Sequence, residues 1–158
     1  MRGKPAKRRE IKPEGIYGSV ILATFINHIM RKGKKSTAQK IVYQALDKVA
    51  VLAKKEPLKV FEEAIRNVQP QLEVRTRRVG GANYQVPMPV RGERQNALSF
   101  RWVIGAARAK KGQPMAEKLA TVLWESSQGT GDAIKKRDDV HRMAEANKAF
   151  AHFARFSK

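Results

Sequence analysis

The residues with the most evident chemistry are nine cationic side chains between positions 75 and 111, a stretch that holds one acid, Glu93. They are Arg75, Arg77, Arg78, Arg91, Arg94, Arg101, Arg108, Lys110 and Lys111. Most are arginines, and a planar guanidinium can bind phosphate with two hydrogen bonds and stack on a base, which an ammonium cannot do. An ordinary solvated face would not need this bias. The stretch therefore predicts contact with nucleic acid.

Further cations gather in three other places. The first 13 residues hold Lys4, Lys7, Arg8 and Arg9 among few apolar side chains, so we expect a disordered basic arm over residues 1–13. Two more pairs complete the predicted contact set: Lys34 and Lys35, and Lys135 and Lys136. The second pair lies near the start of a predicted helix, where the helix dipole disfavours cations. An external anion explains that pair better than a structural role does.

The whole chain is strongly basic. Its 158 residues include 33 Lys and Arg against 14 Asp and Glu, which gives a formal net charge of +19. Such a surplus repels itself and destabilises a compact state, so it indicates a polyanionic partner. Hydrophobic residues still make up 42% of the chain, enough to bury the core of one domain. The composition therefore predicts a folded basic domain and not a cationic tail.

Several other classes of protein are disfavoured. The chain has no cysteine, which excludes disulfide scaffolds and thiol enzymes. The apolar run at residues 20–25 is too short for a membrane span, and no signal-peptide pattern follows the basic start, so we expect a cytoplasmic protein. His141 and His152 have no carboxylate at metal-ligand spacing, and Gly129-Thr130-Gly131 lacks the lysine of a phosphate-binding loop. We expect no enzyme activity, no cofactor and no metal.

Six amphipathic patterns predict six helices that must position these cations. They begin near Ser19, Ser36, Pro57, Glu93, Pro114 and Asp132. Ser36 and Gln39 have the spacing of a capping box, in which each side chain satisfies the other's free backbone N–H. Asp132 is expected to cap the last helix, which would present Met143, Ala144 and Phe150 along one side.

Residues 71–90 change to a period of two and predict a β-hairpin. Gly80-Gly81 supplies the positive φ angles of the turn, and Pro87 and Pro89 restrict their strand to an edge. An arm of this length reaches about 30 Å, so its tip should project from the body. Two strands alone are weakly stable unless something packs on them. Tyr84 beside the tip could stack on a base or pack across the hairpin.

The fold class is therefore mainly α. We expect a disordered basic arm over residues 1–13 and a single RNA-binding helical domain over residues 14–158, with an extended two-stranded hairpin between the third and fourth helices. Trp102 and Trp124 fall at helical spacing and are expected in the core. Phe150, Phe153 and Phe156 recur every three residues in a C-terminal tail that either packs on the body or contacts RNA or a neighbouring protein.

Several sequence motifs resemble the bacterial small-subunit ribosomal protein seven family. They are RTRR at residues 75–78, VGGANYQVP at residues 79–87 and DVHRMAEANKAFAH at residues 139–152. Shorter matches surround the first predicted helix, including Tyr17-Gly18 and Gly33-Lys34-Lys35. The resemblance covers essentially the whole chain. Only the tail after His152 departs from the family's short aromatic ending.

The resemblance implies six helices and a hairpin between the third and fourth, and a role as a non-enzymatic structural constituent of the small ribosomal subunit in the cytoplasm. It implies primary binding to the 3′ major domain of small-subunit rRNA and nucleation of head assembly. The exit-site tRNA, the mRNA and ribosomal small-subunit proteins nine and eleven are the implied neighbours. The resemblance also implies RNA contacts on the basic arm, on the Lys34-Lys35 turn, and at Arg75, Arg77, Arg78, Arg91, Arg94 and Arg101. Gly80, Gly81 and Tyr84 would form a tRNA-side tip.

One alternative remains open on the residues alone. An architectural DNA-binding protein also uses a basic hairpin arm with proline, and inserts apolar wedges into the minor groove. The glycine tip of this hairpin offers no such wedge, and a DNA-binding arm would leave the other basic clusters unexplained. An RNA-modifying enzyme would need a catalytic or cofactor cluster, and the sequence has none that we can identify.

Overall fold

The structure is a computed structural model that describes residue 3 and residues 9–156. Its elements, in chain order, are α1 (Val20–Ile29), α2 (Lys35–Ala53), α3 (Pro57–Val68), β1 (Leu72–Val79), β2 (Ala82–Pro89), α4 (Glu93–Ala109), α5 (Met115–Ser127), α6 (Asp132–Ala146) and the 3₁₀ helix η1 (Lys148–Phe156). The predicted mainly helical fold, with its hairpin between α3 and α4, is confirmed. Of the basic arm, residues 9–13 form neither helix nor strand, and Lys4, Lys7 and Arg8 lie outside the described residues.

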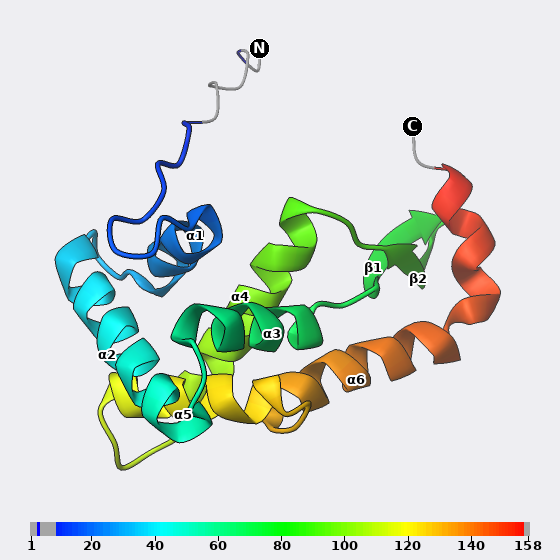
Figure 1. Cartoon of the computed structure of the whole chain (residues 1–158). Helices are drawn as coiled ribbons and strands as arrows, with labels where there is room; N and C mark the ends of the chain where they lie inside the picture. The colour runs from blue at the N-terminus through cyan, green and yellow to red at the C-terminus, as the bar shows by residue number, and fades with distance from the viewer. Residues whose placement is uncertain (1–2, 4–8, 157–158) are drawn as a thin grey trace.

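The helices pack around one hydrophobic core. In Figure 1, α5 lies across the base of the body, where it contacts α2, α3 and α4. Phe25 of α1 lies at the centre of an aromatic group, with its ring 5.1 Å from that of Phe61 and 5.3 Å from that of Phe100. Trp102 and Trp124 are partly buried against this core, as expected. Within the described part of the chain, no helix has the length and hydrophobicity needed to cross a membrane.

Two predicted helix caps are wrong. The first backbone bond of α2 runs from Ala38 N–H to Lys34 O, so Ser36 lies inside the first turn and forms no capping box. Gly131, and not Asp132, precedes α6. Gly131 has φ +92°, and a Cβ there would lie 2.8 Å from Oε2 of Glu125. Because only glycine fits this position, the helix starts after it and Asp132 becomes its first residue.

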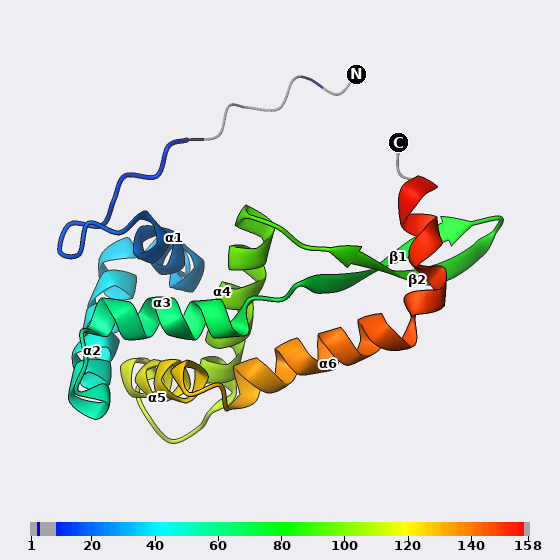
Figure 2. The same cartoon turned by 45° about the vertical axis from the view of Figure 1, so that its right-hand side comes forward.

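The hairpin leaves the body as a long arm (Figure 2). Its strands pair antiparallel, with Arg77 opposite Tyr84 and Val79 opposite Ala82. Gly80 and Gly81 close the turn with φ angles of +57° and +88°, as the sequence predicted. The projecting hairpin and its turn are therefore confirmed.

The C-terminal tail packs against this arm. The last predicted helix ends at Ala146, so Phe150 belongs to η1 and not to α6, which corrects the expected helical stripe. The ring of Tyr84 lies 5.2 Å from that of Phe150 and 5.0 Å from that of Phe153. Figure 2 shows η1, in red, crossing the hairpin. The hairpin thus gains the packing partner that two strands require. The side chain of Phe156, the third aromatic residue of the predicted series, lies outside the described part of the chain.

Candidate nucleic-acid interface

The three arginines of β1 have different surroundings. Successive strand residues point to opposite faces, which places Arg75 and Arg77 on one face and Arg78 on the other. Arg75 forms an ion pair with Glu73, and Arg77 Nη2 lies 3.7 Å from the sulfur of Met88. Arg78 is exposed and joins no ion pair in the described part of the chain. It is the hairpin arginine most available to an external phosphate.

Glu73 is a residue of this site that the sequence did not single out. It is 7% exposed, while its neighbour Leu72 is 37% exposed, which is the reverse of the usual burial. Arg94 of α4 donates to Glu73 Oε2 from Nη2 at 3.0 Å and from Nε at 3.2 Å. Two predicted contact residues, Arg75 and Arg94, therefore share one buried carboxylate. This cluster ties the base of the hairpin to α4.

The remaining cations of the basic stretch, on α4 and beside its two ends, divide into free and engaged groups. Arg91, Arg101 and Lys111 are exposed and join no ion pair among the described residues. Lys110 instead pairs with Glu125 of α5 at 2.7 Å. Arg108 donates from Nη2 to the carbonyl oxygen of Ile29 at 3.3 Å. Burial, with the nearby charge of Arg31, lowers the pKa of Arg108.

The α1–α2 turn and α6 carry the other predicted cations. Lys34 and Lys35 are exposed, and neither joins an ion pair within the described ranges. Lys135 lies 3.6 Å from Asp132, but both side chains are mostly exposed, so this pair contributes little. Lys136 is exposed as well. The predicted cations therefore come from several elements: the hairpin, α4 and its flanks, the α1–α2 turn and α6.

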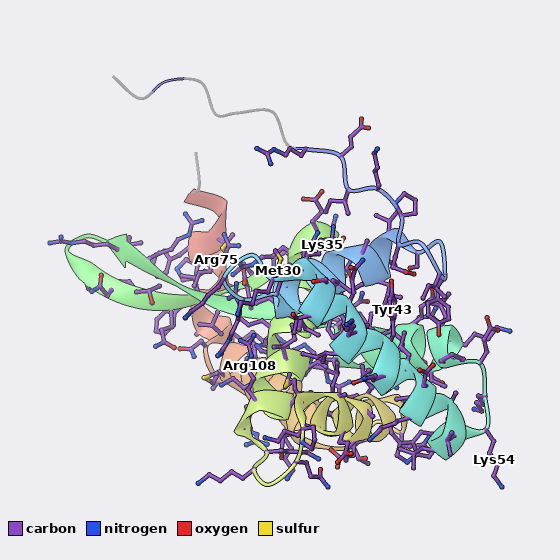
Figure 3. The ribbon with its side chains drawn as sticks, turned by 90° about the vertical axis from the view of Figure 1, so that its left-hand side faces the viewer. Met30, Lys35, Tyr43, Lys54, Arg75 and Arg108 are labelled. Atoms are coloured by element: carbon purple, nitrogen blue, oxygen red, sulfur yellow. The ribbon has the colours of Figure 1, made fainter. Side chains whose placement is uncertain are left out.

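An internal anchor fixes the segment that follows the N-terminal arm. Glu14 is 6% exposed and accepts hydrogen bonds from the backbone N–H of Ile16 at 2.7 Å, from that of Tyr17 at 2.8 Å, and from the hydroxyl of Tyr43. Burial alone would raise the pKa of Glu14, but these bonds outweigh it and lower that pKa. Burial and Glu14 together raise the pKa of Tyr43 to about 12. Tyr43 lies on α2 below this segment (Figure 3).

The histidines and the loop at residues 129–131 form contacts inside the fold. The ring of His28 lies 5.4 Å from that of Phe100, and burial, with Arg101, lowers its pKa. His141 accepts a hydrogen bond from the backbone N–H of Gln71 at 3.0 Å. Thr130 donates its hydroxyl to the carbonyl oxygen of Glu125, which makes its loop a connector. Across the described residues, no three His, Asp or Glu side chains lie together as a metal site would require.

The sequence matches the family described as Ribosomal protein S7p/S5e over residues 1–148. The Small ribosomal subunit protein uS7 of Thermotoga neapolitana is 56% identical over 153 residues, which cover 97% of this chain and 99% of that protein. The chain belongs to the ribosomal protein S7p/S5e family.

Relatives of the same name occur in other organisms. Those of Marinobacter nauticus and Hahella chejuensis are 54% and 55% identical over 152 residues, which cover 96% of this chain and 97% of each relative. The resemblance seen in the sequence motifs is confirmed. A member of this family is a structural constituent of the small ribosomal subunit and not an enzyme.

Proposed function

We propose that this protein is a primary rRNA-binding protein of the small subunit, which binds the 3′ major domain of the rRNA and nucleates assembly of the head. In the cytoplasmic ribosome it would lie near the exit-site tRNA and the mRNA exit path. Small-subunit proteins nine and eleven are its proposed neighbours on resemblance alone. Family membership supports the ribosomal context of this proposal.

The observation that carries the proposal is a set of exposed cations without an acid partner. Among the described residues this set includes Arg78, Arg91, Arg101, Lys34, Lys35, Lys111 and Lys136. They lie on the hairpin, on α4 and just beyond it, in the α1–α2 turn and on α6. Phosphate contacts supply most of the affinity for RNA, and the A-form helix is recognised mainly by its shape. A protein held among several RNA segments needs cations on several surfaces.

The engaged cations have a different proposed role. Arg75 and Arg94 share Glu73, and Lys110 pairs with Glu125, so these three orient the elements that carry the free cations. At the tip, Gly80 and Gly81 have no side chain that would hold the backbone away from RNA. Tyr84 packs against Phe150 and Phe153 and is assigned to holding η1 against the hairpin.

Comparison of the affinities for three nucleic acids tests the proposal. The full chain would be titrated with a small-subunit 3′ major domain rRNA fragment, an unrelated structured RNA of equal length, and duplex DNA, at about 150 mM salt, where surface charges act over about 8 Å. We expect the rRNA fragment to bind at least about tenfold more tightly than the other two. Equal affinity for all three would overturn the proposal. Preference for the duplex DNA would support an architectural DNA-binding protein instead.

A further inference from the structure

A cavity of about 250 Å³ lies where α1, α2, α4 and α5 meet. Its floor is apolar and includes Met30, Ile41 and Met115. Its remaining lining includes three cations from two segments of the chain: Arg31 and Lys34 from the α1–α2 turn, and Arg108 from α4. Met30 and Arg108 come from different parts of the sequence and lie on the side of the molecule seen in Figure 3.

The charges around this cavity are unbalanced. No acidic side chain lines it, and none of the three cations joins an ion pair within the part of the chain that the structure describes. Arg108 is held in place by its bond to the carbonyl of Ile29, and burial together with Arg31 lowers its pKa. Like charges held together without an acid destabilise the fold, and an external anion would relieve that repulsion.

The apolar floor favours an organic ligand with an anionic group over an inorganic anion. Pockets that bind organic ligands pair an apolar lining with a few convergent polar groups, and this cavity has that composition. Methionine sulfur packs well against aromatic rings, and Met30 and Met115 both line the floor. The volume is below the range of about 300–1,000 Å³ typical of drug-sized ligands, so one planar base is the largest ring system that it suits.

We infer that this cavity binds one unpaired nucleotide of an RNA strand, with its phosphate on Arg31, Lys34 and Arg108 and its base against Met30, Ile41 and Met115. The inference rests on the proposed RNA binding and deepens it by naming a site and its ligand. Proteins recognise RNA sequence mainly through unstacked bases of this kind. The base would enter the apolar floor while its neighbours in the strand stay outside.

The five methionines of the chain provide a built-in test. The full chain, labelled with ¹³C at the methionine methyls, would be titrated with inorganic phosphate, with adenosine monophosphate and with single-stranded hexaadenylate. We expect the nucleotide and the hexamer to shift the Met30 and Met115 signals, and to leave those of Met88 and Met143 unchanged. Hexaadenylate should act at a lower concentration than the mononucleotide because its backbone adds phosphate contacts.

Two matched pairs of variants locate the effect. Thr37 lines the cavity and the adjacent Ser36 does not, so T37W should weaken hexamer binding by about tenfold while S36W leaves it near the wild-type value. In the same way, Lys34 lines the cavity and Lys35 does not. K34Q should reduce the Met30 and Met115 shifts more than K35Q does.

Three results would overturn the inference. They are the absence of selective Met30 and Met115 shifts, shifts from inorganic phosphate as large as those from the nucleotide, or tighter binding of the mononucleotide than of the hexamer. Titration of the same wild-type protein with the rRNA fragment separates the two proposals. If the fragment binds specifically while the cavity signals stay unchanged, the proposed function stands and the nucleotide site does not.

Discussion

The carboxylate of Glu73 in β1 and the guanidinium of Arg94 in α4 are joined by two hydrogen bonds, from Nη2 at 3.0 Å and from Nε at 3.2 Å. The same carboxylate pairs with Arg75 on its own strand. One buried acid thus holds two cations and connects a strand to a helix 21 residues further along the chain. The hairpin base is fixed by this cluster before any RNA is bound.

Replacing Glu73 should weaken the fold but not the attraction to RNA. E73Q keeps the side-chain shape and removes the charge, so we expect the free energy of unfolding to fall by about 1–2 kcal/mol in urea denaturation. Affinity for RNA should not fall, because Arg75 and Arg94 keep their charge. E62Q on the exposed side of α3 makes the same charge change and should leave stability near the wild-type value. Equal stability of both variants would contradict the structural role of Glu73.

The hairpin arginines should differ in their contribution to RNA binding. Arg78 has no described acid partner, so R78A should weaken binding and reduce the slope of log K against log salt by about 0.7–0.9. R75A should change that slope less, because Arg75 is paired with Glu73. Filter binding at four or more salt concentrations measures both slopes, with helical circular dichroism as the folding control. A larger change for R75A would reverse this assignment.

The Glu14 anchor should make stability depend on acid pH. The folded-state pKa of Glu14 lies below its ordinary value of 4.5, so its contribution is present above that pH and is lost as the pH falls through the folded pKa. E14Q should therefore be less stable than the wild type by about 1–3 kcal/mol at pH 7, and this difference should shrink as the pH falls below 4.5 and through the folded-state pKa. Thermal denaturation across this pH range measures the difference, and a gap that stays constant with pH would count against the anchor.

Tyr84 should hold η1 in place through its ring and not through its hydroxyl. Y84A removes the ring contacts with Phe150 and Phe153, so we expect faster amide exchange across residues 148–156. Y84F keeps those contacts and should exchange like the wild type. The helical body should keep its protection in both variants, because η1 lies outside the hydrophobic core. Unchanged exchange in Y84A would show that η1 is held by other contacts.

Features governed by local sequence could be predicted. The period of the apolar residues identified all six α-helices, Pro57 marked the start of α3, and Gly80-Gly81 located the hairpin turn. The two wrong caps, at Ser36 and Asp132, depended on which residue precedes the first turn. For α6, the residue before the first turn must be glycine because Gly131 lies close to Glu125, and no local sequence pattern indicates this contact.

The candidate site was only partly predictable for the same reason. Local charge density selected cations that are mostly exposed, but it could not separate Arg78 from the partnered Arg75. The acid that separates them, Glu73, lies just outside the basic stretch. Arg108 joins Arg31 and Lys34 at the cavity only after α1 and α4 pack, so a charge count along the sequence assigns Arg108 to a separate cluster.

The hairpin, η1 and α6 together form a closed triangle on the body. Glu73 and Arg94 join one corner, Tyr84 and η1 join the second, and α6 leads from η1 back to the core (Figure 2). Because the hairpin is held both at its base and near its tip, folding itself sets its direction. The entropy of orienting this arm is then lost during folding and not during RNA contact. If η1 were detached from the hairpin, the RNA would have to order the arm itself, and its affinity would fall without the loss of a single phosphate contact.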